Sequence, residues 1–161
     1  MKRDRSKLKL AQGSDTPWTS VEFASSLDRA RQIETDILDQ CEKNRFNEDD
    51  IFAIKLALEE ALVNAVKHGN KMDPAKMVRV QYHVTKLRVD IVIEDQGPGF
   101  NPASIPNPTD DTRLEMCSGR GIHLMRAFMS SVVYNPRGNM VTLTKLNEGY
   151  RADGSLNSAM A

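Results

Sequence analysis

The sequence is poor in several features that would assign a protein to a broad class. Its 161 residues carry 22 basic and 22 acidic side chains, so it lacks the basic excess typical of nucleic-acid-binding domains. It contains no apolar run near the roughly 20 residues that span a bilayer. Its two cysteines, Cys41 and Cys117, lie too far apart to form a metal-ligand cluster. A reduced, cytoplasmic protein is the simplest interpretation.

The two ends of the chain are expected to be tails. Met1–Leu10 is locally basic but lacks the apolar stretch of a signal peptide, so residues 1–15 are expected to form a basic, flexible tail. Residues 147–161 are mostly small and polar, and they are expected to fray as a flexible C-terminal tail. The whole chain is 40% hydrophobic and 27% charged, which is typical of a folded protein. Residues 16–146 are therefore expected to form one domain.

The hydrophobic pattern predicts both strands and helices. Alternating apolar and polar side chains predict strands over 18–23, 78–84, 87–93, 132–135 and 140–146. Helical spacing, with Ser25 or Ser26 and Asn47 as candidate N-caps, predicts helices over about 26–41, 49–68 and 121–130. Helices on one face of a mixed, mostly antiparallel sheet give an α+β two-layer sandwich. Residues 97–118 are predicted to form a long loop, and loops of that length are often functional.

The second predicted helix carries a polar pair on a side that is not otherwise polar. Ile54, Leu58 and Leu62 lie on one stripe, which predicts the core face. Glu60 and Asn64, four residues apart, share the other side with alanine, leucine and valine side chains. A carboxylate in partly apolar surroundings is a candidate general base, and an amide oxygen suits Mg²⁺. A polar notch in a packing helix explains the pair equally well when the helix is considered alone.

Two glycine-containing segments follow this helix. A buried strand runs into Asp95-Gln-Gly-Pro-Gly99, where Gly97 and Gly99 would let a ligand approach the backbone. Asp95 could accept a hydrogen bond from an exocyclic amine such as that of adenine. Ser118–Met125 opens another helix with two glycines, and the free N–H groups of such a helix start bind phosphates readily. Each segment alone is also consistent with an ordinary strand end or helix cap, and the P-loop pattern is absent.

The three motifs together resemble a known superfamily. Glu-x-x-x-Asn on a helix, then Asp-x-Gly-x-Gly, a long loop and a Gly-x-Gly helix start resemble the GHKL ATPases. Within that group, the likeness is closest to the small bacterial anti-sigma factor serine/threonine-protein kinases of partner-switching systems. It covers roughly Thr16 to Leu146, which is essentially the whole predicted domain.

The resemblance implies a role for each matching residue, with ATP and Mg²⁺ as the cofactors. Glu60 would be the catalytic general base, Asn64 would hold Mg²⁺, and Asp95 would bind the adenine amine. A lid over ATP would extend from about Asn101 to Ser118. The other nucleotide-binding residues would be Lys67, Gly97, Gly99, Gly119, Arg120, Gly121 and Thr142. Family members often place a threonine near adenine just after a glycine on the last strand; in Gly138–Thr142 that position falls near Met140 or Thr142.

The resemblance also implies partners. A kinase of this kind regulates transcription by binding a sigma factor and by phosphorylating an anti-sigma antagonist of the STAS type. It would contact no nucleic acid or membrane directly, and it would form a homodimer through Trp18 to Cys41. The alternative is a nucleotide-dependent, sigma-sequestering module without phosphoryl transfer, but the intact Glu60 favours a kinase.

Overall fold

The computed structural model describes residues 16–104 and 119–150. The strands are β1 (Thr19–Ala24), β2 (Met77–Val84), β3 (Arg88–Glu94), β4 (Ser131–Tyr134) and β5 (Met140–Leu146). The α-helices are α1 (Leu27–Lys43), α2 (Glu48–Val63) and α3 (Gly119–Phe128). A π-helical turn, η1 (Asn64–Gly69), continues α2, and a short 3₁₀ helix, η2 (Pro102–Ser104), follows β3.

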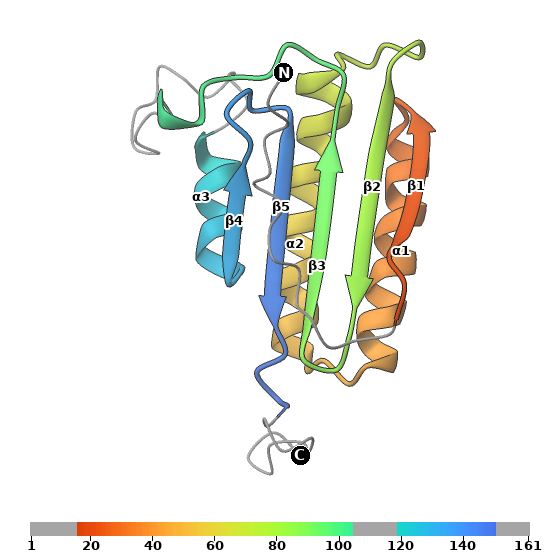
Figure 1. Ribbon diagram of the computed structural model, residues 1–161, viewed down its shortest axis with the longest axis vertical. Coiled ribbons are helices and arrows are strands. Elements are labelled where there is room, and N and C mark those ends of the chain that lie inside the picture. Colours follow the sequence, from red (N-terminus) through yellow and green to blue (C-terminus); the bar gives the residue numbers. More distant parts are fainter. Residues whose placement is uncertain (1–15, 105–118, 151–161) are drawn as a thin grey trace, which may run out of the picture.

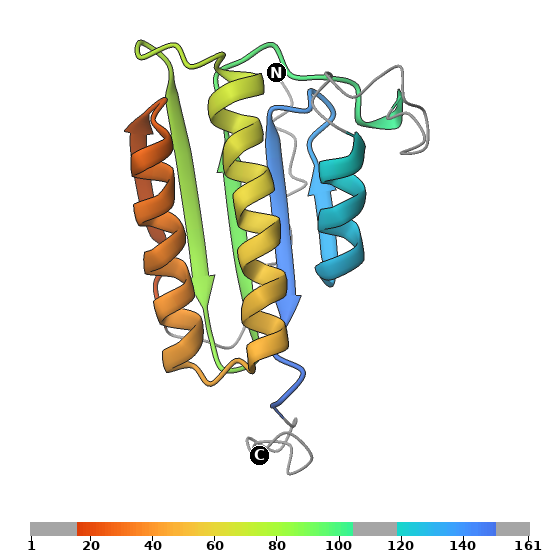
Figure 2. The same cartoon turned by 180° about the vertical axis from the view of Figure 1, so that it is seen from behind.

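These elements form two layers. One five-stranded sheet, in the order β1-β2-β3-β5-β4, carries the three α-helices on one face (Figures 1 and 2). Every strand pairing among the described residues is antiparallel, whereas a mixed sheet was expected. The α+β two-layer sandwich that the sequence predicts is confirmed.

The helix starts have the caps that the sequence predicts. The Ser26 hydroxyl accepts a hydrogen bond from the Arg29 N–H at 3.3 Å, and α1 begins at the next residue. The Asn47 carboxamide oxygen accepts one from the Asp50 N–H at 2.7 Å at the start of α2. Such caps satisfy N–H groups that have no partner within the helix.

The central position of α2 explains its two apolar sides. This helix lies between α1 and α3 over the middle of the sheet (Figure 2). Ile54, Leu58 and Leu62 are fully or almost fully buried, as predicted for the core face. Ala53 and Ala57 are buried as well, because neighbouring helices cover the sides that a lone surface helix would expose to water.

Packed structure continues past Leu146. The side chain of Asn147 is buried, and its nitrogen donates to the backbone oxygens of Asn44 at 3.3 Å and Lys86 at 2.9 Å. These contacts join the end of β5 to the α1–α2 connection and to the β2–β3 turn. Within residues 16–104 and 119–150, no helix is long and apolar enough to cross a membrane.

Candidate functional site

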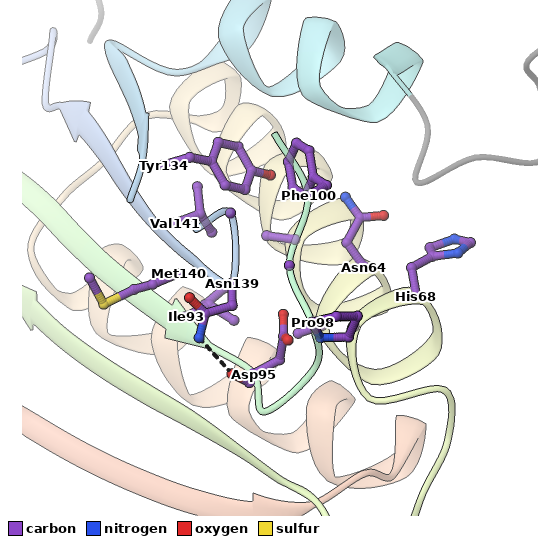
Figure 3. Close-up of a pocket in the computed structure, with 15 residues that line it drawn as sticks. Asn64, His68, Ile93, Asp95, Pro98, Phe100, Tyr134, Asn139, Met140 and Val141 are labelled. Carbon is purple, nitrogen blue, oxygen red and sulfur yellow. Dashed lines mark hydrogen bonds between the residues drawn. The ribbon is translucent and has the colours of Figure 1, made fainter. Parts of the chain in front are cut away.

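A pocket lies where the end of α2 meets one end of the sheet (Figure 3). Three chain segments far apart in sequence form its walls. Its lining residues come from α2 and η1 (Ala61, Asn64, Ala65, His68 and Gly69), from β3 and the following turn (Ile93, Asp95, Pro98, Gly99 and Phe100), and from the β4–β5 hairpin (Tyr134, Gly138, Asn139, Met140 and Val141).

The helical wall of the pocket changes its hydrogen-bond pattern at Asn64. From this residue to Gly69 the chain is π-helical, and the Asn70 N–H donates to the Ala65 oxygen, five residues back, at 2.9 Å. Turns of this kind are rare and are frequently found at functional sites. The buried Asn64 amide nitrogen has no hydrogen-bond partner among the described residues. A buried polar group without a partner is costly, so this pocket wall suits a polar ligand such as a phosphate with its metal ion.

The second wall is the turn after β3, and it packs directly on the end of the π-helix. A Cβ atom added to Gly69 would overlap the Asp95 carboxylate, and one added to Gly97 would overlap the Gly69 carbonyl. Only glycine therefore allows this close approach. The Gly97 N–H donates to the Asp95 carboxylate at 2.8 Å. Burial raises the pKa of Asp95, whereas the Gly97 N–H acts to lower it.

The third wall is the β4–β5 hairpin, which packs against the same turn. The Phe100 N–H donates to the Arg137 oxygen at 3.0 Å. Gly99 and Gly138 have positive φ angles of 74° and 76°, and a side chain on either glycine would overlap the opposite loop. The Phe100 and Tyr134 rings meet edge to face, 5.1 Å apart, and both line the pocket.

Several residues singled out from the sequence meet at this pocket. Asn64, Asp95 and Gly99 line it, and Gly97 supports Asp95 from within the turn. Glu60 is half-buried on α2, one helical turn before Asn64. Glutamate and asparagine therefore share a side of the helix, as predicted.

Other predicted residues lie elsewhere. Lys67 is exposed and lines a groove between α1 and α2 instead of this pocket. Thr142 points to the sheet face away from the helices, since its strand neighbours Val141 and Leu143 belong to the core. Among the described residues, Met140 lines the pocket and Thr142 does not.

The predicted phosphate segment is only partly described. The helix α3 begins at Gly119, two residues before the predicted start, and Gly121 is buried. The side chain of Arg120 and most of the predicted lid, residues 105–118, lie outside the described residues.

Asn139 is a residue of the pocket that the sequence reasoning missed. Its backbone oxygen accepts from the Asp95 N–H at 2.9 Å, and its side-chain nitrogen donates to the backbone oxygen of Asp95 at 3.1 Å (Figure 3). It directly follows Gly138, whereas the family pattern of a threonine after a glycine was expected to fall near Met140 or Thr142. Counting one residue from Gly138 leads to Asn139.

The fold and this pocket together define a class of protein. An α+β sandwich whose central helix presents asparagine to an Asp-x-Gly-x-Gly turn is a GHKL-type ATP-binding domain. A family model described as the histidine kinase-like ATPase domain matches residues 23–145, so the chain belongs to that family.

Similar proteins include bacterial serine-protein kinases and an anti-sigma factor. The chain is 35% identical over 121 residues to the serine-protein kinase RsbW of Bacillus licheniformis, covering 69% of this chain and 74% of that protein. RsbW of Bacillus subtilis strain 168 is 32% identical over 114 residues, or 65% of this chain and 70% of the relative. The anti-sigma F factor of Clostridium perfringens strain SM101 is 33% identical over 93 residues, with shares of 55% and 66%.

A solved structure supports the fold. The crystal structure of the RsbU and RsbW domains of Rv1364c from Mycobacterium tuberculosis matches with a TM-score of 0.54 at 17% identity. The match covers 82% of this chain and 32% of the other, so this chain corresponds to about a third of that protein.

Proposed function

We propose that this protein is an ATP-dependent serine/threonine-protein kinase that phosphorylates an anti-sigma antagonist and otherwise sequesters a sigma factor. The observation that carries the proposal is the pair formed by Glu60 and Asn64. Asn64 lines the pocket, and Glu60 lies one turn away, within about 40° on the helical wheel. The names of the relatives, serine-protein kinase RsbW and anti-sigma F factor, support the same assignment.

The pocket suits ATP with its adenine at the turn after β3. The Asp95 carboxylate would accept a hydrogen bond from the adenine amine, while Gly97 and Gly99 let the turn pack closely against Gly69 and the β4–β5 hairpin. Asn64 would hold Mg²⁺ through its amide oxygen. Gly119, Arg120 and Gly121 would meet the phosphates at the start of α3, where free N–H groups and the helix dipole favour anions. The proposed contacts of Lys67 and Thr142 rest on the family resemblance alone.

The proposed reaction is a phosphoryl transfer to a serine or threonine hydroxyl. Glu60 would take the hydroxyl proton as the oxygen attacks the γ-phosphorus, and the bond from that phosphorus to the β–γ bridging oxygen would break. The products would be ADP and the phosphorylated antagonist. The bound Mg²⁺ would neutralise phosphate charge, while this chain's residues position the nucleotide and accept the proton.

The proposed partners follow from the same assignment. They are a sigma factor and a STAS-type antagonist, which would place the protein in the cytoplasm. A homodimer would use the surface from Trp18 to Cys41.

Two adjacent glutamates provide a matched test of the proposed base. Glu60→Gln should lower phosphate transfer from Mg-ATP to the antagonist encoded beside this gene by at least about 100-fold, because general base catalysis typically contributes this much. Glu59→Gln should retain transfer, since Glu59 lies about 140° from Asn64 around the helix. Binding of ATP should survive both changes.

The second candidate function is a sigma-binding module without phosphoryl transfer. It predicts that wild-type protein binds ATP and its partner but forms no phosphorylated product. Equal transfer by wild type and Glu60→Gln would instead show that the kinase uses another base.

A further inference from the structure

The turn that carries Asp95 is held by side chains from two sides. It begins directly after β3 ends at Glu94 and continues through Gln96 and Gly97. The Gly97 N–H binds the Asp95 carboxylate at 2.8 Å, so the direction of the carboxylate depends on where the turn holds both residues. Two asparagines, Asn139 and Asn70, bond the backbone of Asp95 and Gln96, and the Arg137 guanidinium donates to the Gly97 oxygen at 3.3 Å.

Asn139 holds Asp95 from the β4–β5 hairpin. The backbone oxygen of Asn139 accepts a hydrogen bond from the Asp95 N–H at 2.9 Å. The side-chain nitrogen of Asn139 donates to the backbone oxygen of Asp95 at 3.1 Å. Its own side chain is fixed in turn, because the Asn135 nitrogen donates to its oxygen at 2.7 Å. The Asn135 oxygen accepts from the N–H groups of Gly138, Asn139 and Met140, which organises the hairpin around Asn139.

Asn70 holds the next residue from the opposite side. Its side-chain oxygen accepts from the Gln96 N–H at 2.8 Å. Its nitrogen donates to the Ser25 hydroxyl and to the Met77 oxygen, both at 3.0 Å. Asn70 is 0% exposed, so these bonds form without competition from water.

The adjacent glycine leaves the turn little room to move. Gly69, which precedes Asn70, lies directly against the Asp95 carboxylate, so the carboxylate cannot shift toward the π-helix. The remaining free space is the pocket, where the carboxylate points (Figure 3). Gly69 therefore packs against one side of the turn, and the side-chain amides of Asn70 and Asn139 bind its backbone from two other sides.

We propose that Asn70 and Asn139 are positioning residues that aim the Asp95 carboxylate at the amino group of the bound base. This inference rests on the proposed adenine site, and it adds the residues that give that site its preference for a 6-amino purine. Asn70 is fully buried and does not line the pocket, whereas Asn139 lines it; in both cases the proposed effect is exerted through the backbone around Asp95. Loss of either would let Asp95 rotate away from the amine while the phosphate-binding residues stay in place.

The test compares two nucleotides that differ in one group. The probes are ATP and purine riboside triphosphate, which lacks the 6-amino group but carries the same sugar, phosphates and Mg²⁺. Their Kd values are measured by calorimetric titration of the full chain, so the readout needs no kinase activity. Wild type should bind ATP at least about 10-fold more tightly, because the lost bond involves a charged acceptor. Asp95→Asn should bring the two affinities to within about 3-fold of one another.

The positioning variants should reduce that preference selectively. Asn139→Ala and Asn70→Ala should each lower the ratio of the two Kd values to about 3-fold or less, mainly by weakening the binding of ATP. The matched control is Asn44→Ala, whose part-buried side chain bonds a backbone oxygen of α1 outside the pocket, at the end of the domain where Asn147 packs. It should keep the wild-type ratio.

Two outcomes would overturn the inference. If the asparagines had a purely structural role, their loss would weaken the binding of both nucleotides equally and leave the ratio of the Kd values unchanged. That result would overturn the inference but not the adenine site. A wild-type ratio near one would overturn the adenine site and the inference together. If Asn70→Ala does not fold, Asn139→Ala on the hairpin decides alone.

Discussion

At the scale of single residues, Glu34 makes the stability of this domain depend on pH. The side chain lies on α1 and is only 9% exposed. Burial raises its pKa to about 7, and the nearby Glu59 of α2 adds to the effect both by its charge and by a hydrogen bond. Lys55 and Arg31 oppose the shift. No motif in the sequence indicated this pair of carboxyl groups.

The shift predicts that stability falls as pH rises toward neutrality. Between the ordinary glutamate pKa and about 7, the folded protein binds more protons than the unfolded chain, so the free energy of unfolding decreases with pH. Glu34→Gln should remove this slope and stabilise the protein at pH 8 by about 1 to 3 kcal/mol. Urea unfolding at pH 5 and pH 8 measures both effects. An exposed glutamate of the same helix provides the control, since Glu42→Gln should keep the slope; a slope that persists in Glu34→Gln would contradict the assignment.

Gly69 is a second residue that affects the pocket, because its lack of a side chain lets the Asp95 turn pack against it. Gly69→Ala would place a methyl group inside the Asp95 carboxylate, so the turn must move. We expect ATP affinity to fall at least about 10-fold and the free energy of unfolding to fall by about 1 to 3 kcal/mol. Gly149→Ala is the control, because its added Cβ would meet no atom closer than 3.5 Å. Wild-type ATP affinity in Gly69→Ala would show that the turn has more freedom than its packing indicates.

At the scale of elements, a buried ion pair joins the first turn of α2 to the end of β5. Lys145 Nζ lies 3.4 Å from Asp50, and both side chains are more than nine-tenths buried. Glu148 adds a second acidic partner for Lys145 at 3.2 Å. Burial raises the pKa of Asp50, while the charge of Lys145 lowers it. Each member of the pair therefore makes the burial of the other tolerable.

Removing one member should cost more than removing both. Lys145→Met should destabilise the protein by about 3 kcal/mol, because it leaves the Asp50 charge buried without its cation. The double variant Asp50→Asn, Lys145→Met should recover most of that loss. Urea unfolding of the wild type, both single variants and the double variant forms the required cycle. A double variant less stable than Lys145→Met would mean that the pair does not act as one unit.

The elements themselves could largely be predicted from sequence, because their signals are local. Periodicity and the caps Ser26 and Asn47 place the helices and strands within a few residues of their observed ends. The π-turn after Val63 could not be predicted, because it ends the helix and no further helical repeat follows to reveal the change in hydrogen-bond spacing. Asn139 was missed because its role depends on the pairing of β3 with β5, which brings residues 44 positions apart together.

At the scale of the whole molecule, the pocket joins the central elements of the fold. Its walls belong to α2, to the end of β3 and to the start of β5, and these elements also contribute to the buried core. A ligand that binds all three walls favours the folded state over the unfolded chain. Nucleotide binding should therefore be visible as a change in the stability of the entire domain.

That linkage gives a test of the proposed Mg²⁺ site that does not depend on catalysis. At a concentration 100 times its Kd, Mg-ATP should stabilise the folded protein by about 2.7 kcal/mol. ATP with a chelator should stabilise it less, since the metal would no longer join the phosphates to Asn64. In Asn64→Ala the two conditions should give nearly the same rise in Tm, whereas Asn44→Ala should keep the difference. A full Mg²⁺ effect in Asn64→Ala would show that another residue binds the metal, even though the unpaired amide nitrogen of Asn64 lies in the pocket wall.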